Sequence, residues 1–300
     1  MIRVANAPCS WGALEFDVAC GGRPPSERVL DEMAGSGYAG TELGDWGFLP
    51  TEPEALRAVV AVRGLSLVAG FVPVALADRS AHAEGLARAV ATARLMAAVA
   101  PDALLVLADD NGRDATRTSR AGRIRPEDGL ADLAAWKVFG AGAEEIARAV
   151  RGEAGIGLVF HHHCGGFVET AAEVESFLAV TDPDLVGLCL DTGHWTYAGG
   201  DALDAVQRHG QRVRHVHFKD CDPAVADAAR RDEVDYFEAV RRGVFCELGA
   251  GAVAFPAILD QLRASGYDGW IVVEQDVFPG MGQPLESARH SRAYLHGLGA

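Results

Sequence analysis

The sequence predicts an α/β protein that folds as a closed (β/α)8 barrel, the architecture of a TIM barrel. Short apolar runs, typical of buried parallel strands, alternate with longer amphipathic stretches along nearly all 300 residues. Eight such alternations can be counted, which is the number that closes a parallel barrel. An open doubly wound sheet is the alternative, but Pro8-Cys9-Ser10-Trp11-Gly12, after the first strand, is not a glycine-rich phosphate-binding turn.

In the first half of the chain, strands and helices are expected to follow one another with clear boundary signals. The expected elements are the strands Ile2–Ala7, Tyr38–Leu43, Leu65–Phe71 and Ala103–Leu107 and the helices Pro25–Gly35, Glu52–Arg63 and Ser80–Val99. Ser26 stands near the start of the first helix, where a hydroxyl can cap free N–H groups. Gly64 follows the second helix, where a left-handed residue commonly ends a helix.

The second half begins with an unusual connection. Asp109–Asp128 is polar and rich in arginine without a clear apolar period, and loops this long are usually functional or mobile. The helix expected at Gly129–Arg151 has a possible break at Gly140 and Gly142, and the insertion Pro223–Arg242 is charged and helical, as in a lid or a subunit interface. The other expected elements are the strands Ile156–Phe160, Leu185–Leu190, Val213–Val216 and Trp270–Val273 and the helices Ala171–Val180, Ala202–His209, Phe255–Ala264 and Pro284–His296.

Composition favours a globular enzyme with one domain that spans residues 1–300. Hydrophobic residues make up 49% and charged residues 23% of the chain, and the formal net charge is −15. This negative charge argues against partners rich in phosphate, such as nucleic acids and anionic membranes. None of the six cysteines forms a C-x-x-C pair, and neither a secretory leader nor an apolar membrane span is evident. We therefore expect a cytoplasmic protein with reduced thiols.

Polar clusters follow the four strands of the second half at the point where each strand ends. The clusters are His161-His162-His163, Asp191-Thr192-Gly193-His194, His217-Phe218-Lys219-Asp220 and Glu274-Gln275-Asp276. In a barrel, the carboxyl ends of the strands surround the active site. The sequence therefore predicts one site built from several strands, against the alternatives of a surface histidine triplet and a surface Lys219–Asp220 ion pair.

The alternation of side chains along a strand groups these residues. His161 and His163 are expected to share a face while His162 points away, and His215, His217 and Lys219 are expected to share a face too. One strand-five imidazole together with Asp191, His217 and Glu274 would supply two nitrogen and two carboxylate ligands. This mixed donor set suits a catalytic Mn²⁺, Co²⁺, Fe²⁺ or Zn²⁺.

A metal in such a site polarises a carbonyl while a base removes the neighbouring proton. The candidates for proton transfer are Glu42, His163, His194 and Lys219. Three tryptophans, Trp11, Trp46 and Trp195, follow expected strand ends. They are candidates to wall a sugar-like ring, and packing under loops is the alternative for each.

The motifs after the last four strands resemble those of the xylose isomerase-like barrel superfamily, and within it they are most similar to the inosose dehydratase family. The resemblance is carried by Phe160–Gly166, Thr181–His194, His215–Asp220 and Gly269–Asp276, with weaker similarity in Ala7–Gly12 and Gly40–Gly44. It implies a divalent metal, commonly Mn²⁺ or Co²⁺ (with Mg²⁺ also possible), and loss of water from a cyclic polyol ketone such as 2-keto-myo-inositol. Most of the superfamily has a glutamate as the strand-five ligand, and alignment of the strand ends puts His161 at that position. Asp191, His217 and Glu274 fall on the other ligand positions.

The sequence also departs from the dehydratase pattern in loops that would touch substrate. The departures are at Cys164-Gly165-Gly166, Phe245–Gly251 and Ala108–Gly112 and in the short strand-eight end. A keto-sugar isomerase or epimerase with the same metal site is therefore the alternative, since both reactions begin by removing a proton beside a carbonyl. A nuclease and a barrel that binds a sugar without turnover are further alternatives, and a homo-oligomer is possible.

Overall fold

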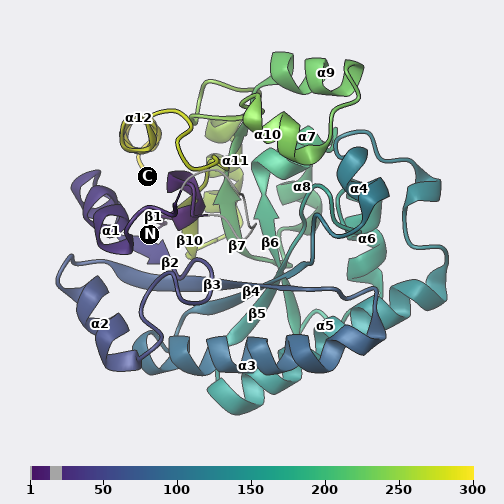
Figure 1. Cartoon of the computed structure of the whole chain (residues 1–300), viewed down its shortest axis with the longest axis horizontal. Coiled ribbons are helices and arrows are strands. Elements are labelled where there is room, and N and C mark those ends of the chain that lie inside the picture. The colour runs from purple at the N-terminus through teal and green to yellow at the C-terminus, as the bar shows by residue number, and fades with distance from the viewer. Residues whose placement is uncertain (1, 14–21) are drawn as a thin grey trace.

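A closed barrel of parallel strands forms the centre of the protein (Figure 1). The computed structural model describes residues 2–13 and 22–300. Around the ring the strands follow the order β1-β10-β7-β6-β5-β4-β3-β2, and every neighbouring pair is parallel. Their bounds are β1 (Arg3–Asn6), β2 (Gly40–Glu42), β3 (Ser66–Val74), β4 (Leu104–Asp109), β5 (Gly157–His161), β6 (Val186–Asp191), β7 (Val213–Phe218) and β10 (Trp270–Val273). The predicted (β/α)8 barrel is thereby confirmed.

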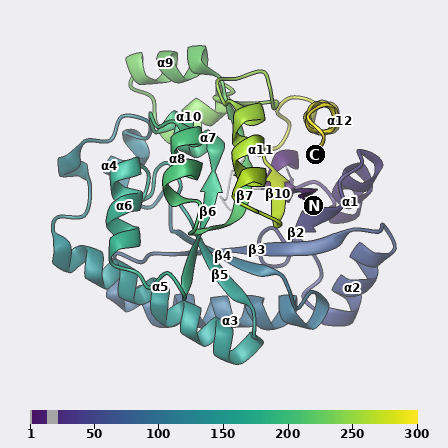
Figure 2. The same cartoon turned by 180° about the vertical axis from the view of Figure 1, so that it is seen from behind.

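Helices surround the barrel, and at least one helix follows each of its strands (Figures 1 and 2). Their bounds are η1 (Pro8–Trp11), α1 (Ser26–Gly35), α2 (Pro53–Ala61), η2 (Arg79–Ala81), α3 (His82–Val99), α4 (Ala115–Ser119), η3 (Pro126–Asp128), α5 (Leu133–Ala154), α6 (Ala171–Ala179), α7 (Thr192–Tyr197), α8 (Ala202–His209), α9 (Pro223–Arg231), α10 (Tyr236–Arg241), α11 (Phe255–Ala264) and α12 (Pro284–Gly297). In both views the C-terminal helix α12 lies beside α1, near the start of the chain. None of the described helices is long and apolar enough to cross a membrane.

The possible break in the fifth long helix does not occur. Helix α5 runs without interruption through Gly140 and Gly142. A Cβ atom at Gly140 would lie 2.9 Å from Val180, and one at Gly142 would lie 2.5 Å from the ring of His82. The two glycines therefore let neighbouring elements approach α5 closely, and this packing outweighs their low helix propensity.

The arginine-rich connection after β4 is held in place rather than left as a plain loop. It contains α4 and η3, and the Arg117 side chain is fully buried. The Arg117 guanidinium donates to both carboxylate oxygens of Glu173, at 2.7 and 2.9 Å, and to the carbonyl oxygen of Gly166 at 2.7 Å. Such a bidentate pair satisfies the buried charge and ties the connection to the loop after β5.

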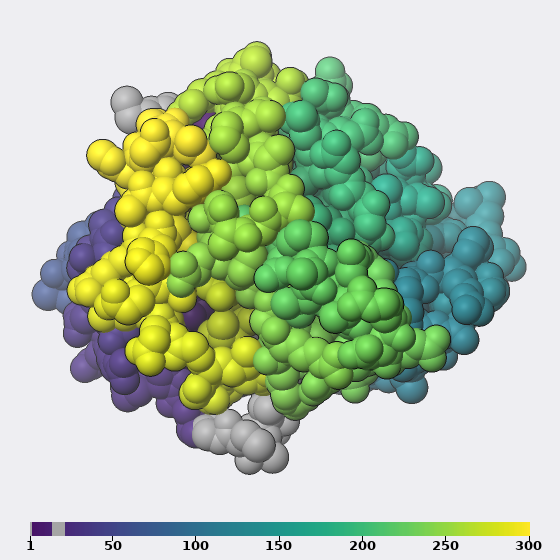
Figure 3. Space-filling view, turned by 90° about the horizontal axis from the view of Figure 1, so that it is seen from above, coloured from purple at the N-terminus to yellow at the C-terminus, as the bar shows by residue number. Residues whose placement is uncertain are grey.

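A small cap covers the carboxyl ends of the strands. It consists of helices α9 and α10 and the antiparallel pair β8 (Asp220–Cys221) and β9 (Phe245–Cys246), and it has its own apolar core. Arg230 donates to the carbonyl oxygens of Gly122 and Tyr197, so the cap is fixed to the arginine-rich connection. Seen from above in Figure 3, the green and yellow segments that follow β7 form most of this face. The insertion Pro223–Arg242 is thus helical as predicted, and it lies over the mouth of the barrel.

Candidate metal centre and active site

Side chains from four neighbouring strands meet at the carboxyl end of the barrel. Donor atoms of His161, Asp191, His217 and Glu274 all lie within 4.8 Å of one another, and all four residues are buried. His161 Nε2 is 3.5 Å from Asp191 Oδ2, and His217 Nδ1 is 3.2 Å from Glu274 Oε2. The structure therefore brings together the four residues that the sequence suggests as metal ligands.

Strand alternation explains why these residues face one another. His161 and His163 point into the barrel, whereas His162 packs outward against Trp195, with ring centroids 5.2 Å apart. On β7, His215 and His217 share the inner face as expected. The alternation predicted from the sequence thus holds on both strands.

The donor set fits a divalent cation. Asp191 Oδ2 and His217 Nδ1 are buried and 3.8 Å apart, and among the described residues neither makes a hydrogen bond of good geometry, although Lys219 Nζ lies 3.2 Å from Asp191 Oδ2 and Glu274 Oε2 lies 3.2 Å from His217 Nδ1. Buried polar atoms are almost always satisfied, so such a pair beside a second carboxylate points to a site for a cation. Two imidazole nitrogens with two carboxylate oxygens match the ligand preference of catalytic Mn²⁺, Co²⁺ and Zn²⁺.

The Lys219 ammonium lies beside this set, completely buried. Lys219 Nζ is 3.2 Å from Asp191 Oδ2, 3.1 Å from Glu274 Oε2 and 3.1 Å from Asp276 Oδ2. Burial lowers the pKa of an ammonium, but these carboxylates hold the pKa of Lys219 well above its usual value. Burial raises the pKa of Asp191, yet Lys219 and nearby histidines keep it well below its ordinary range. The surface Lys219–Asp220 ion pair is therefore wrong as an interpretation, because both residues are buried and Lys219 pairs elsewhere.

Asp220 has a different part in the structure. Its carboxylate accepts hydrogen bonds from the backbone N–H groups of Gly249, Gly251 and Val253. It thus shapes the loop after β9 and contributes no donor atom to the candidate cation sites among the described residues.

The Glu42 carboxylate contacts two histidines of β7, including the proposed ligand His217. Its Oε1 atom accepts from His215 Nε2 at 2.8 Å and from His217 Nε2 at 3.0 Å. Burial alone would raise the pKa of this carboxyl, but the two histidines have the larger combined effect and lower the pKa from 4.5 to about 2. A carboxylate on Nε2 leaves Nδ1 of His217 directed at the other donors, as in carboxylate–histidine–metal triads. The geometry suits a positioning role better than the role of a base suggested by the sequence.

A second group of side chains, suited to proton transfer, lies next to the first. His194 Nε2 is 3.0 Å from Lys219 Nζ, and the rings of His163 and His194 have centroids 3.8 Å apart. Burial lowers the pKa of both histidines well below 6.5, so they are neutral at physiological pH. The Tyr236 hydroxyl donates to Asp276 Oδ2 at 3.0 Å. Neutral imidazoles beside an ammonium provide both a proton acceptor and a proton donor.

Sequence reasoning did not assign Asp276 or Tyr236. Asp276 lies two residues after Glu274, so the same alternation that grouped the histidines could have found it. Tyr236 belongs to α10 in the cap, and nothing in the local sequence indicates that its hydroxyl reaches the strand ends.

A cavity of about 680 Å³, open solvent at its mouth included, adjoins both groups. Its lining includes polar side chains described above. It also includes apolar side chains, namely Phe71 from β3, Phe237 and Val240 from α10, and Phe278 after β10. A pocket that combines polar and apolar surface suits a ring that carries both hydroxyl groups and C–H bonds.

The three tryptophans do not lie among the described residues that line this cavity. Trp11 is buried and its indole donates to Glu32 at 2.7 Å. Trp195 is buried against His162 on the outer side of the barrel, because α7 begins directly after Asp191 and turns it away. Trp46 is 54% exposed. Phenylalanines supply the aromatic part of the described cavity lining, and packing accounts for the places of Trp11 and Trp195, so contact of a tryptophan with the substrate stays a prediction.

Comparison with known proteins agrees with this architecture. Residues 30–297 match the model of the family described as xylose isomerase-like TIM barrel. The chain is 36% identical to the rhizopine catabolism protein MocC of Rhizobium meliloti, over 100% of this chain and 89% of that protein. It is 33% identical to an inosose dehydratase of Geobacillus kaustophilus, over 99% and 94% of the two chains. Among solved structures, the E. coli 3-keto-D-glucoside 4-epimerase YcjR has a TM-score of 0.71 and 17% identity, with coverage of 99% and 100%.

Proposed function

This chain belongs to the xylose isomerase-like TIM barrel family, and we propose that it is a metal-dependent dehydratase of a cyclic polyol ketone, 2-keto-myo-inositol or a close relative. The observation that carries the proposal is the convergence of four donor atoms beside neutral histidines and a charged lysine at one cavity. Full-length similarity to an inosose dehydratase supports the substrate class.

The proposed ligands are His161, Asp191, His217 and Glu274, and the proposed ion is Mn²⁺ or Co²⁺. When bound, such an ion polarises the ketone oxygen and stabilises the negative charge that develops as the α proton leaves. No thiolate belongs to this four-residue set, so hard or borderline ions are favoured over thiophilic ones.

The residues of the chain supply the proton transfers. His163 and His194 are neutral, buried and next to the cavity wall, so either imidazole can accept the proton from the carbon beside the ketone. Lys219 is charged and lines the cavity, which suits donation of a proton to the departing β hydroxyl. The cap packs against these three side chains, since the Tyr236 ring contacts His163 and the Phe245 ring contacts His194 and Lys219, and this packing limits their contact with water.

The lining residues also limit the substrate class. Lys219 is the one lysine or arginine among the described residues that line the cavity, and three carboxylates surround it. A phosphate group would find no free cation there. We therefore propose an uncharged polyol ketone rather than a sugar phosphate, with no nucleic-acid partner, and a cytoplasmic enzyme whose five described cysteines are free thiols.

The test is turnover of 2-keto-myo-inositol by metal-stripped protein, with and without added Mn²⁺ or Co²⁺, followed by the ultraviolet absorbance of the dione product. Product that depends on metal supports the dehydratase. Stoichiometric metal uptake without product would overturn the substrate assignment.

An epimerase of a keto sugar is the second candidate, because it begins with the same proton removal beside a carbonyl at the same proposed metal site. His163 or His194 can remove the proton, but their rings pack together on one side of the cavity, so return of a proton to the opposite face of the carbon would need a group from across the cavity. Incubation in deuterated water separates the candidates. An epimerase incorporates deuterium beside the ketone and keeps every hydroxyl, whereas a dehydratase loses one hydroxyl as water.

A further inference from the structure

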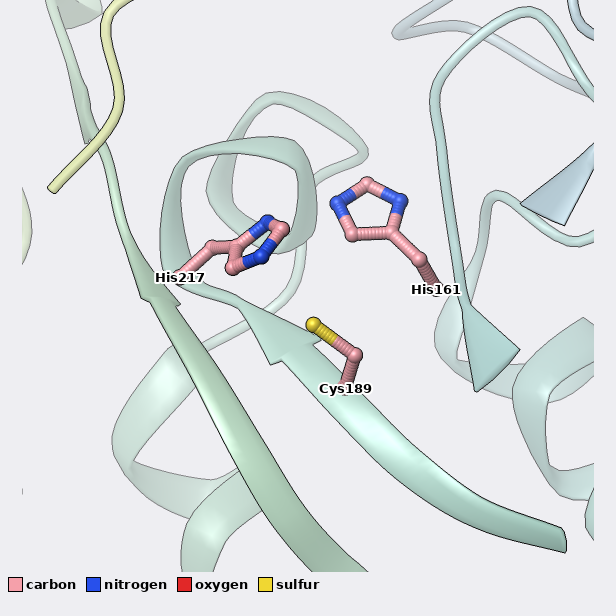
Figure 4. A group of neighbouring side chains, drawn as sticks. All are labelled: His161, Cys189 and His217. Carbon is pink, nitrogen blue, oxygen red and sulfur yellow. The ribbon is translucent and has the colours of Figure 1, made fainter. Parts of the chain in front are cut away.

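The inner face of β6 carries a thiol directly below the proposed metal ligands. Cys189 lies two residues before Asp191, its side chain belongs to the apolar interior of the barrel, and it is fully buried. Its backbone neighbours are His161 on β5 and His215 on β7. In Figure 4 the sulfur atom points up from β6 toward the space between the rings of His161 and His217.

The three side chains converge closely enough to share one ion. A donor atom from each of His161, Cys189 and His217 lies within 4.8 Å of the other two. Nδ1 of His161 is buried without a hydrogen-bond partner among the described residues, and Nδ1 of His217 lies 3.2 Å from Glu274 Oε2 without hydrogen-bond geometry. Both histidines line the cavity, and the Cys189 thiol lies behind them, so an ion would enter this position from the cavity past the two imidazoles.

The chemistry of the two donor sets differs although they share two histidines. The upper set adds the carboxylates of Asp191 and Glu274, which favour harder ions such as Mn²⁺. The lower set adds a sulfur atom, which favours Zn²⁺ and Cd²⁺. His217 Nε2 is bonded to Glu42, so Nδ1 is the nitrogen that His217 offers to either set. One nitrogen cannot serve two ions, so occupation of one position excludes the other.

We propose that His161, Cys189 and His217 form a second cation position, which takes a thiophilic divalent ion such as Zn²⁺ or Cd²⁺ in place of the ion held by the upper set. On binding, the Cys189 thiol passes its proton to water and the sulfur forms the bond to the ion. The inference deepens the proposed metal site without depending on the reaction. In this proposal Cys189 and Asp191, both on β6, determine which metal binds. Thiophilic ions are then expected to inhibit the enzyme, because they occupy the lower set and exclude the ion of the upper set.

The test is titration of the metal-free, full-length protein with Cd²⁺, followed by the ultraviolet charge-transfer absorption of a cadmium–sulfur bond. The wild-type protein is expected to show this band, saturating at one equivalent. Cys189→Ser and Cys189→Ala are expected to lose the band and to bind Cd²⁺ about tenfold or more weakly. A band that persists in both variants overturns the proposal.

Cys9→Ser is the matched control, because Cys9 offers the alternative thiol. Its sulfur lies within 4.8 Å of donor atoms of Glu274 and Asp276 at the cavity wall. The band is expected to be unchanged in Cys9→Ser, and its loss there would assign the ion to Cys9 instead.

Competition between Mn²⁺ and Cd²⁺ tests the proposal without any substitution at Cys189. Mn²⁺ at saturation is expected to suppress the band, and Glu274→Gln is expected to weaken this suppression while it leaves the band itself. Simultaneous binding of both ions would contradict the shared histidines. None of these readouts involves turnover, so a failed dehydratase assay leaves the outcome interpretable.

Discussion

The two halves of the barrel share one architecture but carry different side chains on their inner faces. In β1, β3 and β4 the interior is filled by small or apolar residues such as Ala5, Val68 and Val106. In β5, β6, β7 and β10 the same layer gives way, toward the strand ends, to histidines and carboxylates. The β/α units thus place side chains at equivalent positions around the barrel. Polar, potentially catalytic side chains occupy these positions in the second half, and small or apolar side chains occupy them in β1, β3 and β4.

The largest expected effect comes from removing a carboxylate in the second half. Asp191→Asn takes away a charged donor at the centre of the ligand set, so we expect turnover to fall on the order of 10³-fold. Metal content of the purified protein and kcat are the measurements. Asp45→Asn is the control, since Asp45 lines the cavity without belonging to a candidate cation site among the described residues. Equal losses in both variants would contradict the division between the halves.

Removal of the buried ammonium is expected to have the next largest effect. Lys219→Gln leaves Asp191, Glu274 and Asp276 without their cation, which should lower the free energy of unfolding of the metal-free protein by about 3 kcal/mol. Turnover should fall by about 10²-fold or more, because a proton donor is lost. A bound divalent ion offsets the carboxylate charge, so the stability loss should shrink in Mn²⁺.

Denaturant unfolding with and without Mn²⁺ measures this difference. Lys137→Gln is the matched control, since Lys137 is the other lysine of the chain and lies exposed on α5. A stability loss in Lys219→Gln that does not respond to Mn²⁺ would argue that Lys219 and the ion do not share the carboxylates.

The stability of the protein is expected to depend on pH through Glu169, which is buried in the loop after β5. Its carboxylate accepts from the backbone N–H groups of Gly165 and Gly122. Burial nevertheless raises the pKa of Glu169 from 4.5 to about 7. The folded state then holds the Glu169 proton more tightly than the unfolded state does. The contribution of this proton to the free energy of unfolding is therefore complete below pH 4.5 and is lost as pH rises through 7. The full loss is about 3 kcal/mol.

Unfolding midpoints at several pH values between 5 and 8 test this expectation in wild type and Glu169→Gln. The variant loses one hydrogen bond at every pH, because an amide has a single acceptor oxygen. The informative quantity is therefore the slope of stability with pH, which should be flatter in Glu169→Gln. Equal slopes would show that Glu169 ionises normally.

The same contrast explains what the sequence could predict. Strand positions follow from local alternation, so the grouping of His161 with His163, and of His215 with His217, could be predicted from spacing alone. Contacts between distant elements could not. The burial of Arg117 could not be predicted from the arginine-rich connection alone, because its partner Glu173 lies 56 residues further along the chain. Tyr236 reaches the site because the cap packs over the strands, and Trp195 misses it because a helix starts one residue after Asp191.

The smallest effect, and the sharpest test of the contrast, is expected from Glu42→Gln, since Glu42 is the first-half carboxylate that touches a proposed ligand. An amide can still accept one hydrogen bond but carries no charge, so it holds His217 less firmly with Nδ1 toward the ion. We expect Mn²⁺ affinity to fall by about 10- to 100-fold while kcat at saturating Mn²⁺ changes little. Metal titration and kcat measure the two quantities, and Glu54→Gln, an exposed position of α2 in the same half, is the control. A large loss of kcat at saturating metal would instead make Glu42 a base, and the chemistry would then be shared by both halves of the barrel.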